Sequence, residues 1–346
     1  MSEFELPDEL QIKVLSSFED AGPVWRRIES RAACYVYQHY DWLNNWFTFV
    51  GRHLKLETSL VCVEDGSGRP LLVLPLAVEQ RGPFRCLTWL GGALTDYNAP
   101  LVDPVFSNKL SRKQFETIWS RIEALLPSYD VIHFERQPDL IDGAKNPLLY
   151  LPCEIGEATA HNFLVRGNWR DYYHSRTSTK MRSTDRRNER RLAELGELEF
   201  SVVREPGDAA PIVEKMIAQK SIQYDRSGAR NIFREAGHRE FHHFCAEQFC
   251  DGLLVHLSTL KAGSEILAIH WGMTFGRRFY HFMPTYDRSA YAKFSPGRLL
   301  LLKLMEWSFE NQIEVFDFTV GNDVYKKDWC DKELKLYDCI LPITSL

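Results

Sequence analysis

The sequence lacks the signatures of several common protein classes. Its eight cysteines form no C-x-x-C pair, which favours reduced cytoplasmic thiols over a disulfide framework or a zinc site. It has no G-x-S-x-G nucleophile elbow, no P-loop and no long dinucleotide fingerprint, so the commonest hydrolase and nucleotide-binding motifs are absent. The longest apolar runs, near Leu71–Val78 and Leu299–Leu304, are far too short to span a bilayer.

The chain also lacks an excess of positive charge. Its formal net charge is −5, so no global basic field favours DNA as a partner. The first residues, Met1–Gln11, are acidic and polar, which does not resemble a secretory signal peptide. We therefore expect a cytoplasmic protein.

Apolar residues, in contrast, are plentiful. They make up 45% of the 346 residues, with 9 Trp and 21 Phe, enough for one large domain or two ordinary ones. We interpret most of these aromatic side chains as core residues. Stacking on a substrate is the less favoured interpretation.

The first half of the chain shows apolar spacings and turn residues typical of an α+β fold. They predict these elements, in order: strand Gln11–Leu15, helix Pro23–Tyr37, a helix from Asp41 with that residue as N-cap, strand Thr58–Glu64, strand Pro70–Val78, strand Arg85–Leu90, a loop over 91–100, helix Ser111–Leu126 and strand Val131–Glu135. Pro75 lies inside a predicted strand and indicates an edge or a bulge there.

The second half repeats this order. It predicts, in order: strand Leu253–Leu260, strand Glu265–Thr274, strand Arg278–Met283, a loop, a helix with apolar residues from Leu300 to Ser308, and strand Glu314–Val320. Both halves thus run hairpin, strand, loop, helix, strand. We interpret this as a duplicated fold, although two α/β halves can also be similar by chance.

The stretch 278–329 carries the strongest functional signal. A loop ends in Phe294-Ser295-Pro296-Gly297-Arg298, and the helical spacing begins directly after it. Such a turn presents free backbone N–H groups at the positive end of a helix dipole, which suits a phosphate or an oxyanion.

This stretch resembles the GNAT acyltransferase superfamily, and within it the branch of CelD-type proteins and Fem-like peptidoglycan aminoacyltransferases. The ordered residues that carry the resemblance are Pro284-Thr285-Tyr286-Asp287, Tyr291, Phe294-Ser295-Pro296-Gly297, Phe316-Asp317-Phe318, Gly321, Tyr325-Lys326 and Trp329. The usual GNAT pyrophosphate loop has two spaced glycines, whereas this chain has only Gly297.

The resemblance implies an α+β fold of two GNAT-like halves, each a mixed, mostly antiparallel sheet flanked by helices. Residues 1–160 would form the acceptor-side domain, and residues 161–346 the C-terminal GNAT domain with the acyl-donor loop. Ser295, Pro296, Gly297 and Arg298 would hold the pyrophosphate of acyl-CoA. Asp96 and Tyr97, in the corresponding loop of the first half, would face the acceptor.

A basic segment lies between the halves. Residues 176–191 hold seven basic and two acidic side chains, and we expect a connector helix over 176–195. On such a helix Arg182, Arg186 and Arg190 form one stripe. This stripe is either a solvated connector or a platform for a phosphate-bearing substrate, for which the planar arginine fork is suited.

Four further residues are candidates for catalysis. Alternation along the strand places His270 on the same face as Ala268 and Gly272, where the small neighbours leave room for a ligand. The imidazole of His270 suits general-base chemistry. The alternative is a core histidine with a structural partner. Asp317 could orient a base, serve as an acceptor ligand or cap a nearby turn. Tyr325 and Lys326 follow Gly321 in a predicted loop, where Lys326 could stabilise an oxyanion.

A histidine-rich segment has the spacing of a metal site. His238, His242, His243 and Cys245 lie within eight residues, and histidines four apart can chelate zinc on a helix. However, Phe241, Phe244, Cys245 and Phe249 form an ordinary core stripe, and although Cys250 is close by, a third or fourth ligand is unaccounted for. We therefore predict no metal.

Together these features predict an acyltransferase that uses acyl-CoA as co-substrate. The resemblance implies an amine or hydroxyl acceptor, a small molecule, lipid or glycan of cell-envelope, polysaccharide or lipid biosynthesis, and peripheral membrane association is left open. One alternative is a Fem-like aminoacyl-tRNA-dependent transferase, although a net acidic chain without a long basic extension argues against tRNA. Another is a catalytically silent binding protein of the same fold, because the loop has a single glycine.

Overall fold

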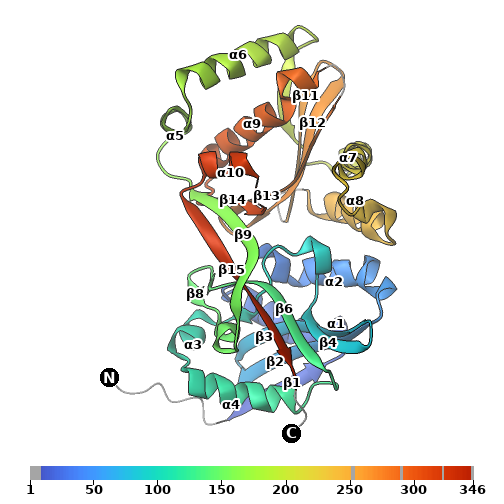
Figure 1. Cartoon of the computed structure of the whole chain (residues 1–346), viewed down its shortest axis with the longest axis vertical. Helices are drawn as coiled ribbons and strands as arrows, with labels where there is room; N and C mark the ends of the chain where they lie inside the picture. Colours follow the sequence, from blue (N-terminus) through green and yellow to red (C-terminus); the bar gives the residue numbers. More distant parts are fainter. Residues whose placement is uncertain (1–8, 251–253, 289–290, 322, 344–346) are drawn as a thin grey trace. The chain divides into compact units, whose positions relative to one another are not determined.

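The computed structural model describes residues 9–250, 254–288, 291–321 and 323–343. The chain divides into two compact units. Unit 1 contains the residues up to Thr159 and again those from Leu334 onward, and unit 2 contains Ala160–Glu333. Figure 1 shows both units and labels their elements where there is room.

Unit 1 is a sheet with helices. Its elements are β1 Leu10–Leu15, α1 Phe18–Glu29, α2 Tyr40–Phe49, β2 Leu56–Asp65, β3 Pro70–Arg81, β4 Phe84–Trp89, β5 Leu101–Val102, α3 Pro104–Lys109, α4 Arg112–Glu123, β6 Val131–Pro138, the short pair β7 Leu140–Ile141 and β8 Ala144–Lys145, and the start of β9 Glu154–Leu164; short 3-10 turns lie at 36–38, 51–53, 92–94 and 147–150.

The elements of unit 2 follow along the chain. They are the rest of β9, α5 Trp169–Arg176, α6 Thr179–Ala193, β10 Leu198–Val202, α7 Pro206–Ser227, α8 His238–Phe249, β11 Val255–Ala262, β12 Glu265–Phe275, β13 Arg278–Tyr286, α9 Pro296–Glu310, β14 Val315–Val320, α10 Val324–Trp329 and the start of β15 Lys332–Pro342, with 3-10 turns at 232–234 and 292–294.

The two units have the same kind of sheet. In unit 1 the strand order is β1-β2-β3-β4-β6-β15, and in unit 2 it is β9-β14-β13-β12-β11-β10. Each sheet is antiparallel apart from one parallel pair, β4 with β6 and β13 with β14. A helix-containing connection joins the strands of each parallel pair, as parallel strands require. The expected α+β fold of two GNAT-like halves is therefore confirmed.

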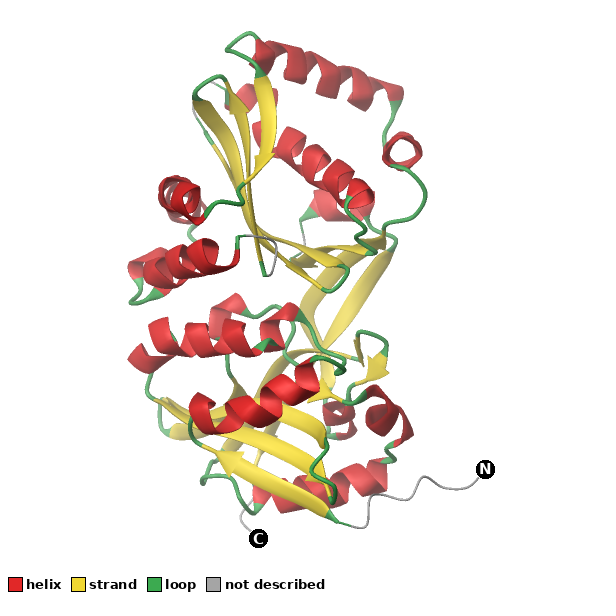
Figure 2. Cartoon of the chain, turned by 180° about the vertical axis from the view of Figure 1, so that it is seen from behind, coloured by secondary structure: helices red, strands yellow, loops and turns green. Residues whose placement is uncertain are grey.

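Helices cover both faces of the unit 2 sheet. Helix α9 packs on β11, β12 and β13, while α7 packs on β12 and β13 and α8 on β11. Figure 2 shows the sheet of this unit between these helices. Apolar residues of α9, including Leu300, Leu304 and Met305, are buried against the strands. The helical spacing read from the sequence therefore corresponds to a helix with a buried apolar face.

The ends of the chain differ from the expected division at residue 160. The described part of the chain from Leu334 onward belongs to unit 1, where β15 pairs with β6 from Leu336 opposite Pro138 to Pro342 opposite Val131. Conversely, the outer strand of unit 2 is β9, which begins in unit 1 and pairs with β14. The sheet of unit 1 thus includes β15 from the end of the chain, and the sheet of unit 2 includes β9 from before the boundary region. A simple division of the sequence into two halves does not predict either strand.

Two helix predictions need correction. The helix predicted over 23–37 ends at Glu29 and begins earlier, at Phe18, because the Ser17 side chain caps the N–H of Asp20. The next helix begins at Tyr40, and its N-cap is His39, whose side chain accepts from the N–H of Asp41. Asp41 therefore lies inside the first turn.

Pro75 lies on an interior strand rather than an edge. It pairs with Leu60 of β2. On the other side of β3, the ladder with β5 reaches Val73 and the ladder with β4 begins at Leu76. The missing N–H of the proline therefore falls in a gap between two ladders, where it breaks no pairing.

Among the described residues, no helix combines the length and the apolar character needed to cross a membrane.

Candidate active site

The parallel strands β13 and β14 diverge soon after they meet. They pair at Arg278–Val315, Phe279–Phe316 and Tyr280–Asp317, and their pairing ends there. Beyond this point β13 continues along β12 as far as Tyr286, whereas β14 continues along β9 as far as Val320. Beyond this point the facing edges of β13 and β14 are not paired with each other. Unpaired backbone groups at a strand edge can hydrogen-bond to an extended ligand.

A β-bulge in β13 lies at the same place. Met273 of β12 is opposite Tyr280, but Trp271 is opposite Met283, so β13 contains an extra residue in this interval. A bulge re-aims side chains and backbone groups and is often found next to active sites. The extra residue of β13 thus lies immediately after its last pair with β14.

The start of α9 follows the end of β13. Ser295 is exposed, adopts a left-handed conformation (φ 52°) and makes no side-chain capping bond, and Pro296 is the first helical residue. Gly297 lies against Tyr286, since a Cβ at this glycine would be 2.9 Å from Cδ1 of that ring. The helix start is therefore not capped by its own serine, which leaves it suited to an anionic group.

Arg298 is committed to the protein itself. Its Nε and Nη2 atoms donate to Asp185 of α6 at 2.7 and 3.0 Å. The same carboxylate accepts from the Tyr173 hydroxyl at 2.8 Å. The expectation that Arg298 holds a pyrophosphate therefore competes with a bidentate ion pair that joins α9 to α6.

Asp317 is a buried anchor for the end of β14. Its carboxylate pairs with Arg278 at 2.8 Å and accepts the N–H of Thr319 at 2.8 Å. Thr319 has a φ of 60°, a conformation that a β-branched residue adopts only when its surroundings fix it. Of the three roles expected for Asp317, these contacts support the turn cap, and its roles toward a base or an acceptor stay predictions.

Lys326 and Tyr325 lie on a short helix, α10, and not in the predicted loop. Lys326 is only 4% exposed, and its Nζ donates to the carbonyl of Val320 at 2.8 Å and lies 3.7 Å from Asp323. A Cβ at Gly321 would be 2.7 Å from this Nζ, so the glycine admits the ammonium group. Tyr325 packs on Phe318, and burial raises the pKa of its phenol.

His270 is completely buried. Its ring stacks on His281 at 4.9 Å with an angle of 5° between the planes, and it also stacks on Phe279. Neither ring nitrogen has a hydrogen-bond partner in the described part of the chain. Burial, together with the neighbouring His281, lowers its pKa well below the ordinary value.

The space expected beside His270 is filled. A Cβ at Gly272 would lie 2.0 Å from Cε1 of His270, so the imidazole itself occupies the room that the small neighbour leaves. The expectation of a ligand on this face is therefore wrong. The role of His270 as a base stays a prediction, and a neutral, buried imidazole is poorly placed for it.

The basic helix is confirmed as α6, and its exposed face is rich in arginine. The buried residues are Asp185, Asn188 and Leu192, and the exposed face carries Arg186, Arg187, Arg190 and Arg191. Arg182 is different, because its guanidinium donates to the Thr177 carbonyl and to Thr179 Oγ1. Arg186 is thus available to a ligand, whereas Arg182 also holds the start of its own helix.

The two acceptor candidates of unit 1 lie in different surroundings. Tyr97 is fully buried, with ring contacts to Tyr35 at 4.7 Å and Tyr37 at 5.8 Å, which leaves no exposed part of it to contact an acceptor. Asp96 is mostly buried, and its carboxylate is 3.7 Å from Arg136. Only Asp96 keeps a surface position compatible with the expected role.

The histidine-rich segment forms α8 and packs as core. His242 is fully buried between Phe233 and Trp271, and its Nδ1 bonds to the carbonyl of His238 at 2.6 Å. His243 pairs with Glu214 of α7. In the described ranges no group of three or more His, Cys, Asp or Glu side chains is arranged to hold a metal ion.

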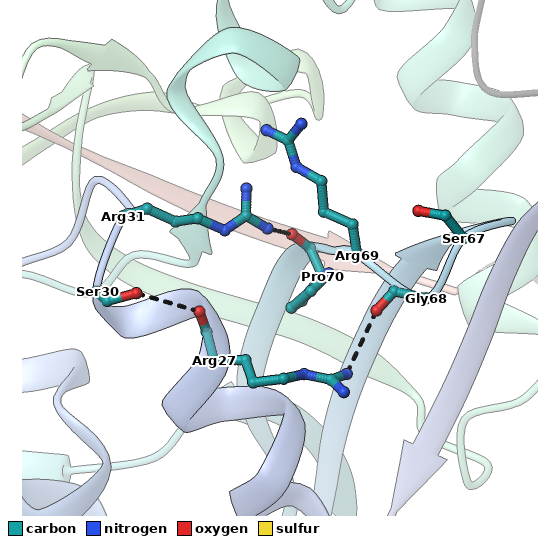
Figure 3. Close-up of a pocket in the computed structure, with 7 residues that line it drawn as sticks. All are labelled: Arg27, Ser30, Arg31, Ser67, Gly68, Arg69 and Pro70. Carbon is teal, nitrogen blue, oxygen red and sulfur yellow. Dashed lines mark hydrogen bonds between the residues drawn. The ribbon is translucent and has the colours of Figure 1, made fainter.

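An arginine-lined pocket lies in unit 1, and none of the predicted site residues lines it (Figure 3). Its lining residues are Arg27, Ser30, Arg31, Ser67, Gly68, Arg69 and Pro70. Arg31 and Arg69 both pair with Asp103 at 2.5 Å, and Arg27 pairs with Glu64. Arg27 ties α1 to the end of β2 and to the β2–β3 turn, whereas Arg31 and Arg69 meet on Asp103, the N-cap of α3. These carboxylate partners account for the positions of the guanidinium groups.

Lys220 of α7 was not among the site residues predicted from the sequence. Its Nζ lies 3.4 Å from the carbonyl of Pro284 on β13, and the neighbouring Gln219 accepts from the Thr285 hydroxyl at 2.7 Å. Burial, reinforced by Arg288 and Lys326 against the attraction of Asp323, lowers the pKa of Lys220 to about 8. The available signal was that Lys220 follows the buried Met216 and Ile217 at helical spacing, which places a lysine on an apolar helix face.

Comparisons with known proteins agree with this geometry. Residues 179–327 match the acetyltransferase (GNAT) domain family. The whole fold is similar to FemX (12% identity, TM-score 0.63, covering 96% of this chain and 97% of that one). It is also similar to L-PGS from Bacillus licheniformis (11% identity, TM-score 0.54, 94% and 93%).

A third solved structure with this fold is a tandem GNAT protein from the clavulanic acid biosynthesis pathway (13% identity, TM-score 0.53, covering 98% of this chain and 100% of that one). A search of curated proteins gave no match. The GNAT resemblance of the sequence is thus confirmed over the region that holds β13, α9 and β14. Residues 179–327 thus match a GNAT domain, and the fold of the whole chain is similar to that of solved FemX and tandem GNAT structures.

Proposed function

We propose that the protein is an acyltransferase that moves an acyl group from acyl-CoA to an amine or hydroxyl acceptor. The observation that carries this proposal is the start of α9, which lacks a side-chain cap. It comes after β13, the strand that diverges from β14, with residues 287–295 between them. The helix start offers backbone N–H groups to the pyrophosphate, near Ser295 and Gly297. The solved structure of the clavulanic acid pathway protein is described as the form without AcCoA. This description names AcCoA in connection with a protein of the same fold, and we take it as support for an acyl-CoA donor here.

The remaining groups would serve the acyl centre. Backbone N–H groups of β13 near the bulge would polarise the thioester carbonyl, and the buried ammonium of Lys326 would stabilise the oxyanion. Tyr325 adds a hydroxyl on the same short helix. The acceptor would belong to cell-envelope, polysaccharide or lipid biosynthesis, as the resemblance to the CelD-type and Fem-like branch implies, with Asp96 as the remaining candidate contact in unit 1.

Ligand-induced stabilisation tests the donor. Acetyl-CoA and longer acyl-CoAs at 100 times their Kd should raise the stability of the folded protein by about 2.7 kcal/mol, because they bind only the native state. The measurement is thermal unfolding with each acyl-CoA, with adenosine 3′,5′-bisphosphate as a fragment control. An unchanged melting temperature with every acyl-CoA would reject the donor.

An aminoacyl-tRNA donor is the second candidate, and the exposed arginine face of α6 favours it. If tRNA binds there, Arg186→Ala with Arg190→Ala should weaken tRNA binding about tenfold or more and reduce its salt dependence, because phosphate contacts release counterions. Filter binding at two salt concentrations measures this effect. Arg277→Ala, a surface arginine outside α6, is the matched control, and equal losses in both variants would show that binding is only non-specific.

A further inference from the structure

Each of the diverging strands, β13 and β14, has a backbone carbonyl that contacts a lysine ammonium group. Lys326 donates to the carbonyl of Val320 at the end of β14, and Lys220 lies 3.4 Å from the carbonyl of Pro284 on β13. Both carbonyls come after the last pair between these strands, Tyr280–Asp317. The two amines therefore flank the place where β13 and β14 separate.

Helix α7 fixes Lys220 in this position. The Gln219–Thr285 hydrogen bond and the Lys220–Pro284 contact are consecutive along both the helix and the strand. The aromatic ring of Tyr224, one turn further along α7, lies 5.3 Å from the ammonium. The side chain is thus held by packing and does not extend freely into solvent.

The surroundings of the two amines differ. Lys326 has Asp323 at 3.7 Å, whereas no carboxylate of the described residues lies within ion-pair distance of Lys220. The charged groups that act on Lys220 are Asp323 and Lys326 beside α10 and Arg288 after β13. Lys220 in turn acts on His281 and His270 of the sheet. Two like groups in such different environments are suited to different protonation states, and hence to an acid and a base role.

We propose that Lys220 is the general base that takes the proton from the acceptor, an inference that rests on the proposed acyl transfer. The acceptor nitrogen or oxygen attacks the thioester carbon, a new bond to that carbon forms, and the acceptor proton moves to the neutral Nζ of Lys220. The carbon–sulfur bond then breaks and its electron pair leaves with sulfur. Lys220 returns the proton to the thiolate, which gives free CoA and restores the amine.

Chemical labelling of lysines tests this inference without a known acceptor. Trace acetic anhydride labels only neutral amines, and mass spectrometry reports each lysine between about pH 6 and 11, a range that spans ordinary lysine titration near pH 10.4. At a pH of about 8, Lys220 should therefore react at least about tenfold faster than an ordinary lysine. Lys215, on the same helix, is the internal reference.

A second arm places Lys220 relative to the donor. The ketone analogue of acetyl-CoA, in which CH₂ separates sulfur from the carbonyl, cannot transfer its acyl group. Once bound, it should protect Lys220 from labelling at least about fivefold and leave Lys215 unchanged. The variant Lys220→Met should bind the analogue with the affinity of the wild type within about twofold, because the polar and ring contacts of Lys220 are with Pro284 and Tyr224 and not with the start of α9.

The outcomes separate the two proposals. A labelling midpoint of Lys220 near that of an ordinary lysine, or full labelling while the analogue is bound, would overturn the assignment of Lys220. If the analogue does not bind the wild-type protein, the acyl-CoA donor is wrong, and the midpoint alone decides on Lys220. Where an acceptor supports turnover, Lys220→Arg should lose kcat by about 10²–10⁴-fold, as Lys220→Met does, because arginine keeps the charge but cannot release its proton.

Discussion

Among the buried histidines of unit 2 are His242, His256, His270 and His281, and burial lowers the pKa of each. The pKa falls to about 3 for His242, His256 and His281, and well below the ordinary value for His270. In the unfolded chain the same groups titrate near 6.5. Below this pH the unfolded state binds more protons than the native state, so stability falls as the pH falls from about 6.5 toward 3.

This linkage gives a prediction for His270. Each histidine that stays neutral in the fold contributes a slope of about 1.4 kcal/mol per pH unit below its unfolded pKa. His270→Gln should therefore reduce the slope of unfolding free energy between about pH 6 and 4 by that amount, although it lowers stability at neutral pH through lost stacking. Urea unfolding at several pH values measures the slope.

The control is His174→Gln at an exposed position of α5, which should leave the slope unchanged. An unaltered slope in His270→Gln would mean that His270 exchanges protons with solvent in the native state. That result would restore it as a candidate base.

Gly297 gives a second test at the scale of the residue. Gly297→Ala should lower CoA affinity about tenfold or more, because its Cβ occupies the approach of a phosphate to the helix start. Gly207→Ala is a closely matched control, since Pro206-Gly207 begins α7 as Pro296-Gly297 begins α9, and nothing lies within 4 Å of a Cβ at Gly207. Calorimetry measures both affinities.

The ring of Tyr286 could itself cause the loss, because it lies 2.9 Å from the new Cβ. The double variant Gly297→Ala with Tyr286→Ala removes that contact. Weak CoA binding in the double variant supports the helix start as the donor site, whereas full recovery would contradict it.

At the scale of the element, the buried carboxylate of Asp185 joins α6 to α9. Asp185 is 7% exposed at its side chain and accepts from Arg298 and Tyr173. Asp185→Asn should destabilise the protein by about 2–4 kcal/mol, because it leaves a partly buried arginine without its counter-charge. In the Arg298→Met background the same change should cost much less, and a double-mutant cycle by urea unfolding measures the difference.

The exposed pair Arg191–Glu194 on the same helix is the reference, since both side chains are more than half exposed. Glu194→Gln should cost under about 1 kcal/mol. Equal costs for Asp185→Asn and Glu194→Gln would show that the contact between α6 and α9 contributes no more than a surface pair.

Several elements could be predicted from the sequence because their residues alone determine them. Alternation and turn residues placed β2, β3, β11, β12 and β13 within a few residues of their observed bounds. Helix α5 was missed because none of its residues is buried, so it has no apolar period to detect. Helix α10 was missed because six residues are too few for a helical pattern, and Lys326 is buried by contacts with Val320 and Asp323 that follow from the fold.

The site shows the same limit. The Pro296-Gly297 helix start was found because local chemistry defines it. Lys220 was not found, because its position in the site is defined by its contact with Pro284, which is 64 residues away in the sequence. His270 was misjudged for a related reason, since alternation shows which residues share a face and not which ring fills the space on it.

At the scale of the whole molecule, β15 makes unit 1 depend on the end of the described chain. Removal of residues 334–346 would leave β6 without the partner that pairs from Val131 to Pro138. We expect this deletion to destabilise unit 1 and to increase aggregation, because an interior strand becomes an open edge. Hydrogen exchange of β6 measures the loss.

Strands β11, β12 and β13 of unit 2 should keep their protection in the same experiment, since their ladders contain no residue from 334–346. Equal loss of protection in both units would mean that they unfold as one cooperative body. Unchanged protection of β6 would show that β15 contributes little to unit 1.

The late position of β15 also affects the order of events during protein synthesis. A ribosome that has made unit 1 up to Thr159 must still add unit 2 before residues 334–342 exist. At ordinary elongation rates this takes on the order of 10 to 40 s. During that interval the nascent chain carries β6 without its final partner, so a chaperone that shields strand edges would raise the yield of folded protein more than one that acts after release.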